Sequence, residues 1–132
     1  MAILTGTASW TDKTLIACGR FYPPEAKSAE ARLRHYASVF PTVEVDSSYY
    51  AMPSATNAAL WVERTPQDFV FDVKAFRLFT GHQTNVDVLH QDIQAALGAT
   101  SKQLYYKDVP QEVREELWRR FKQALWPLKT AG

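Results

Sequence analysis

The stretch Thr42-Val43-Glu44-Val45-Asp46-Ser47-Ser48-Tyr49-Tyr50 decides the fold of this 132-residue chain. In its first half, two valines alternate with Thr42, Glu44 and Asp46. This period of two predicts a β-strand with one apolar and one polar face. The serines and tyrosines that follow break the alternation, so the strand ends in a segment rich in polar and aromatic side chains.

Two further apolar runs predict strands, at residues 2–7 and at residues 69–74. Helical patterns lie between the strands. Residues 27–40 carry apolar side chains at spacings of three and four, and Ser54 caps a second helix that ends near Thr65. Strand and helix therefore alternate, which is typical of βαβ units and predicts a parallel sheet.

The chain changes character after Lys74. Apolar spacing predicts a helix over residues 85–97, stopped by a glycine, whereas residues 99–106 have no assignable pattern. Asp108 and Gln111 have the spacing of a capping box for an amphipathic helix over residues 110–126.

Composition describes one globular domain, because 46% of the residues are hydrophobic, 22% are charged and the formal net charge is +1. Basic residues are interleaved with acids, including the i,i+4 pairs Glu115–Arg119 and Glu116–Arg120. This interleaving argues against a dedicated DNA-binding module. Composition thus excludes no enzyme class but favours neither nucleic acid nor membrane as a partner.

A cytoplasmic location is expected. Cys18 is the single cysteine, so no intramolecular disulfide forms, and the N-terminus lacks the pattern of a signal peptide. No apolar run approaches the roughly 18 residues of a membrane span. The three histidines show no metal-binding spacing, no glycine-rich phosphate motif is present, and the sequence identifies no cofactor.

Several segments, taken in order, resemble the domain-of-unknown-function 72 family, also called YecE-like. They are Gly6-Thr7-Ala8-Ser9-Trp10, Phe21-Tyr22-Pro23-Pro24, residues 40–50, Met52-Pro53-Ser54, Trp61, Arg64-Thr65-Pro66 and residues 69–75. The resemblance implies an α/β fold of the TIM type, a β/α barrel of about twice this length. It further implies that residues 1–132 are the N-terminal part of a single barrel domain, an incomplete barrel of three parallel strands and their helices.

Two positions depart from the family pattern, Ala8 where serine is usual and Asp46 where asparagine is more typical. The family has no established reaction. The resemblance therefore supplies a fold and no mechanism.

Charged side chains share the strand face opposite the valines. If the valines face the helices, Glu44, Asp46 and Lys74 point into the barrel, at or near the strand ends where these barrels have their active sites. We expect these three as catalytic candidates, with Lys74 holding an anion or activating a nucleophile and a carboxylate as acid or base. The alternative is a structural Lys74–Glu44 pair.

Aromatic and polar residues gather at the same strand ends. The substrate-binding candidates are Trp10, Tyr22, Ser47, Tyr49, Tyr50 and His82. The aromatic rings can stack on bases or sugars, or can simply pack the loops. The serine can bind phosphate or cap a turn, and His82 lies in a loop that follows the third strand.

Three functional hypotheses remain open. The first is an enzyme-like pocket for an anionic or phosphorylated small molecule. The second is a nucleic-acid-binding or repair-type barrel that stacks bases on Trp10, Tyr49 and Tyr50. The third is a truncated fragment without activity of its own, loosely packed or self-associating through its open sheet edges.

Overall fold

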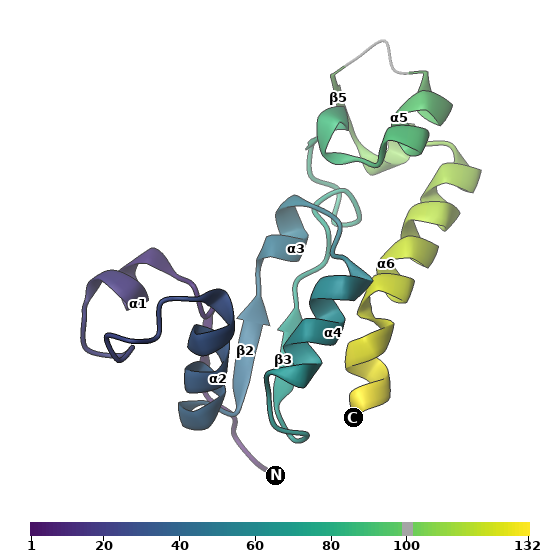
Figure 1. Cartoon of the computed structure of the whole chain (residues 1–132). Helices are drawn as coiled ribbons and strands as arrows, with labels where there is room; N and C mark the ends of the chain where they lie inside the picture. The colour runs from purple at the N-terminus through teal and green to yellow at the C-terminus, as the bar shows by residue number, and fades with distance from the viewer. Residues whose placement is uncertain (99–101) are drawn as a thin grey trace.

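The computed structural model describes residues 1–98 and 102–132 as a mixed α/β structure built on a parallel sheet (Figure 1). The sheet order is β1 (Gly6–Ala8), β2 (Thr42–Val45) and β3 (Val70–Val73). Both strand pairs are parallel, and the register aligns Ala8 with Glu44 and Glu44 with Asp72. The predicted α/β class and the three parallel strands are confirmed.

The first strand begins later than the sequence predicts. Residues 2–5 lie outside β1 and are exposed, although the apolar run starts at residue 2. The reason is the partner strand: Gly6 pairs with Thr42, the first residue of β2, so the preceding residues have no strand beside them. A side chain at Gly6 is excluded as well, because a Cβ there would lie 2.1 Å from the Thr42 carbonyl oxygen.

A helix follows each of the first two strands. The helical elements are α1 (Lys13–Ala17) and α2 (Ala29–Val39) after β1, and α3 (Ser47–Tyr50) and α4 (Ala55–Glu63) after β2. The Ser54 hydroxyl caps α4 by accepting a hydrogen bond from the backbone N–H of Asn57 at 3.1 Å, as predicted. Ser28 caps α2 in the same way through the N–H of Ala31.

The connection after β3 is longer and contains a small two-stranded sheet. It comprises β4 (Thr84–Asn85), the 3-10 turn η1 (Val86–Val88), α5 (Gln91–Leu97), β5 (Gln103–Leu104), the 3-10 turn η2 (Tyr106–Asp108) and α6 (Gln111–Ala131). In Figure 1, α6 returns along the sheet and lies beside α4, while α5 and β5 stand beyond the carboxyl ends of the parallel strands.

One helix in this connection begins later than the sequence predicts. The helix predicted over residues 85–97 begins at Gln91, because residues 84–85 pair antiparallel with residues 103–104. It does end at a glycine, Gly98, whose φ is 53°. The segment left unassigned, residues 99–106, contains β5, and its residues 99–101 lie outside the described ranges.

The capping box predicted at the start of α6 is absent. Pro110 is the N-cap, and no side chain caps the helix, because Asp108 belongs to the preceding turn η2. The helix also continues past Trp126, through Pro127, to Ala131.

Two apolar cores hold these layers together. The first lies between the sheet and the early helices and centres on Tyr36, Val43, Val45 and Phe69. The second lies under the long connection and joins Phe76, Leu78, Leu89, Ile93, Val109, Leu117 and Phe121. The predicted orientation of the valines towards the helices is confirmed, since Val43 and Val45 are 1% and 2% exposed.

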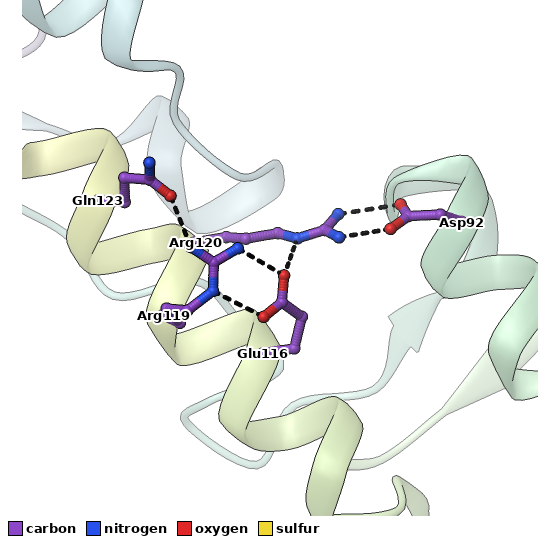
Figure 2. A network of polar contacts seen from close by, with 5 residues as sticks. All are labelled: Asp92, Glu116, Arg119, Arg120 and Gln123. Carbon is purple, nitrogen blue, oxygen red and sulfur yellow. Dashed lines mark hydrogen bonds and ion pairs between the residues drawn. The ribbon is translucent and has the colours of Figure 1, made fainter.

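An ion-pair network fastens α5 to α6 (Figure 2). Arg120 donates to both carboxylate oxygens of Asp92 and, through Nε, to Glu116 at 2.7 Å. Arg119 binds Glu116 as well. Of the two i,i+4 pairs predicted, Glu116–Arg120 is present, whereas Arg119 pairs at i,i+3 instead.

Candidate functional site

The polar face of the sheet carries the candidate catalytic residues. Lys74 follows β3, and its Nζ lies 3.7 Å from Oε1 of Glu44 on β2. The two side chains are 50% and 45% exposed in this three-stranded sheet. This face has no covering layer in the described structure, and water screens the pair.

Tyr49 is the centre of the cluster next to Lys74. The Lys74 ammonium and the Arg77 guanidinium each lie 5.4 Å from the centre of its ring. Tyr50 and His82 meet the same ring edge-on, at 5.1 Å and 5.7 Å between ring centres. The structure therefore brings Glu44, Lys74, Tyr49, Tyr50 and His82 together at one edge of the sheet.

Arg77 is a member of this cluster that the sequence did not indicate. Its backbone N–H donates to the Tyr49 carbonyl at 3.0 Å, which fixes the residue beside the ring. Its Nε is buried and has no hydrogen-bond partner among the described residues. No strand or helix pattern covers this position, so the sequence alone carried no signal for it.

Ser48 fixes the backbone beneath the cluster. Its hydroxyl is buried and lies 2.5 Å from the Lys74 carbonyl and 3.1 Å from the Val45 carbonyl. A single hydroxyl proton serves these two acceptors, which belong to the ends of neighbouring strands. Ser48 thus has a structural role, and it ties the end of β2 to the residue that carries the ammonium.

A pocket of about 170 Å³ lies beside the cluster, over the ends of β1 and β2. It is lined by residues 9–11, residues 45–47 and Trp61. The candidates Trp10, Asp46 and Ser47 belong here, and Trp10 meets Trp61 edge-on at 5.5 Å and 80°. Ser9 turns the chain into this pocket with a φ of 64°, an uncommon conformation for a residue other than glycine.

Tyr22 does not line this pocket. Its hydroxyl donates to the Trp10 carbonyl, and its ring packs edge-on against Phe21 at 4.7 Å. Burial, together with a smaller contribution from the nearby Tyr36, raises the pKa of Tyr22 to about 12. The side chain therefore stays protonated and supports the loop that carries Trp10.

Metal-ligating residues do not converge in the described part of the chain. No group of three or more His, Cys, Asp or Glu side chains among residues 1–98 and 102–132 is arranged to hold an ion. Within the same residues, no helix combines the length and the hydropathy needed to cross a bilayer.

Comparison with known proteins identifies relatives that are longer than this chain. UPF0759 protein YunF of Bacillus subtilis (strain 168) is 34% identical over 125 residues, which are 95% of this chain and 34% of that protein. The chain thus spans about a third of that relative's length.

Two crystal structures of a DUF72 family protein from Enterococcus faecalis V583 are also similar, each at 24% identity over 75% of this chain. The match covers 31% and 28% of those chains, with TM-scores of 0.48 and 0.47. The profile of the family described as "Protein of unknown function DUF72" matches residues 4–132. This chain belongs to the DUF72 family of uncharacterised proteins.

Proposed function

We propose that residues 1–132 are the N-terminal part of a single TIM-type β/α-barrel domain whose pocket binds a small anionic or phosphorylated molecule. The order β1-β2-β3 with parallel pairing supports the barrel, because successive strands lie side by side and helices follow β1 and β2 directly. The ligand then binds at the carboxyl ends of the strands, where loops from all of them meet.

The convergence of Lys74 and Arg77 on Tyr49 carries the proposal. Two cations lie at one aromatic ring. Among the described residues, Glu44 pairs with Lys74, and Arg77 has no carboxylate partner. Lysine has three donor hydrogens, and one carboxylate contact at 3.7 Å leaves donors free for a ligand. The two cations can therefore bind an anionic group at this point.

The other candidates then have distinct roles. Lys74 binds the anionic group, while Glu44 orients the ammonium from the neighbouring strand. Glu44 and Asp46 are the carboxylates available for proton transfer if the bound molecule is also transformed. His82 packs against Tyr49, and its Nδ1 lies 2.8 Å from the Thr80 hydroxyl, which fixes the ring at the edge of the cluster.

The nucleic-acid alternative has weaker support. Tyr50 is 60% exposed and offers a ring for stacking. Trp10, however, is partly buried and packs against Trp61, and Tyr49 is already surrounded by Lys74 and Arg77. A continuous platform of three rings is therefore not available.

Nuclear magnetic resonance titration of this chain with inorganic phosphate tests the proposal. Lys74→Ala should weaken phosphate binding by about 10- to 100-fold, as expected for a hydrogen bond to a charged group. Stability should change by less than about 1 kcal/mol, because the Glu44 pair is exposed. Lys122→Ala, an exposed lysine on α6, is the matched control and should leave binding unchanged.

Equal phosphate affinity in the parent chain and in Lys74→Ala would contradict the proposal. Salt-sensitive binding of a single-stranded oligonucleotide with no phosphate response would favour the nucleic-acid alternative. No binding of either would leave the third hypothesis, a fragment without activity.

A further inference from the structure

The pocket over β1 and β2 contains polar groups that the protein itself leaves without partners. The Asp46 carboxylate is half-buried, does not cap α3, and makes no hydrogen bond or ion pair within residues 1–98 and 102–132. The Ser47 hydroxyl beside it is exposed and likewise makes no hydrogen bond within these residues. A partly buried carboxylate without a protein donor favours a ligand that donates hydrogen bonds.

Two further lining residues, Ser9 and Thr11, add hydroxyl groups to the pocket. Ser9 and Thr11 place their hydroxyl oxygens 3.1 Å apart, and the Thr11 backbone N–H donates to the Ser9 oxygen at 3.0 Å. The Ser9 backbone N–H donates to the Glu44 carbonyl at 2.9 Å, which holds this residue beside β2. The Trp10–Trp61 pair adds two aromatic rings to the lining of the pocket.

These groups favour one kind of ligand, a molecule with several hydroxyl groups. A sugar hydroxyl both donates and accepts hydrogen bonds. It can donate to the Asp46 carboxylate, and it can donate to or accept from the hydroxyls of Ser9, Thr11 and Ser47. An ammonium group only donates hydrogen bonds, so it could satisfy Asp46 but could not accept a hydrogen bond from Ser47 or from whichever hydroxyl of the Ser9–Thr11 pair is not already donating. The apolar face of a sugar ring also packs on an aromatic side chain.

The size and position of the pocket restrict the kind of ligand further. A volume of about 170 Å³ corresponds to roughly five or six water molecules at about 30 Å³ each, which matches one monosaccharide-sized group. The pocket lies over β1 and β2, and the Lys74–Tyr49 cluster lies over β2 and β3, so the two share β2. One ligand with a hydroxyl-bearing part and an anionic part can fill both.

We infer that the pocket formed by Ser9, Trp10, Thr11, Asp46, Ser47 and Trp61 binds the sugar part of a phosphorylated sugar. This inference rests on the proposed function, because the phosphate of the same molecule would lie at Lys74. It assigns the substrate class to that site and gives Asp46 the role of a specificity-determining residue.

Titration of the full chain with three probes tests this inference: ribose 5-phosphate, ribose and inorganic phosphate. Ribose 5-phosphate should bind at least about tenfold more tightly than inorganic phosphate, since the sugar adds hydrogen bonds to a charged group. Asp46→Asn should remove most of that advantage, and it should not weaken the binding of inorganic phosphate. Ser47→Ala should reduce the same advantage by a smaller factor.

Asp68→Asn is the matched control, since Asp68 is exposed and precedes β3 at the opposite end of the sheet. Equal affinities for ribose 5-phosphate and inorganic phosphate would overturn the inference while leaving the proposed function in place. An equal loss of affinity for ribose 5-phosphate and for inorganic phosphate in Asp46→Asn would also overturn the inference and leave the proposed function in place. Absence of phosphate binding in any form would overturn the proposed function and the inference with it.

Discussion

Replacement of Tyr36 by phenylalanine removes one hydroxyl group that joins the first two strands. Tyr36 is fully buried on α2, and its hydroxyl oxygen accepts a hydrogen bond from the Thr7 backbone N–H at 2.6 Å. The same hydroxyl donates to the Thr42 carbonyl at 3.0 Å. One side chain thus binds a backbone donor of β1 and a backbone acceptor of β2.

The expected cost follows from these contacts. Tyr36→Phe keeps the ring and its packing against Phe40 and Phe69, at 5.1 Å and 6.3 Å between ring centres. What is lost is the hydroxyl, which leaves a partly buried N–H without this acceptor at about 1–3 kcal/mol. We therefore expect the free energy of unfolding to fall by about 1–3 kcal/mol, out of a total of roughly 5–15 kcal/mol for a domain.

Urea denaturation followed by circular dichroism measures this change. With a slope of about 2 kcal/mol per molar urea, the midpoint should fall by roughly 0.5–1.5 M. Tyr105→Phe is the control, because Tyr105 is 41% exposed. The curves need two protein concentrations, since association would make stability depend on concentration. A midpoint equal to that of Tyr105→Phe would refute the structural role given to the Tyr36 hydroxyl.

Two further predictions concern acid stability and association. Hydrogen bonds from Arg120 lower the pKa of Asp92 to about 2, and those from Arg119 and Arg120 lower the pKa of Glu116 to about 2. Because both values are depressed, their contribution to stability is complete above the ordinary carboxyl range and is lost as the pH falls from about 4.5 to about 2. Urea titrations at several pH values should therefore show a smaller loss over this range for Arg120→Gln than for the exposed control Arg20→Gln, and equal losses would contradict the assignment. Sedimentation velocity should show that this chain self-associates as concentration rises, because β1 and β3 are open edges and Val70 on β3 is 43% exposed; a monomer at every concentration would refute this.

Local patterns in the sequence predicted the parallel sheet, because strand signals and burial coincide there. Alternation of valines with polar residues in β2 gave both the strand and the face that packs on the helices. The extent of β1 was not predictable in the same way, because it depends on where Thr42 supplies a partner. The start of α5 also depends on a pairing partner, since residues 84–85 pair with residues 103–104, which lie beyond the helix in the sequence.

In the candidate site, too, some residues were predictable from local sequence and others depend on tertiary contacts. Residues that directly follow β2 and β3 were predictable, because the carboxyl ends of parallel strands meet at one edge. Arg77 was not, since its place beside Tyr49 depends on a backbone hydrogen bond between two loops. Tyr22 was assigned to the site from its loop, but its hydroxyl is directed to the Trp10 carbonyl and serves that loop instead.

The division into two cores has a consequence for cooperativity. Val73 on β3 packs against both cores, whereas most other core residues belong to one of them. Where few side chains are shared, each part opens with its own free energy, and the less buried part opens more often than the whole molecule unfolds. The connection that carries α5 is the part that opens more often. Apolar contacts in the second core and the Arg120–Asp92 ion pair hold it to α6. Hydrogen exchange in this connection would then proceed through partial opening, while the strands that carry Glu44 and Lys74 exchange only when the sheet itself opens.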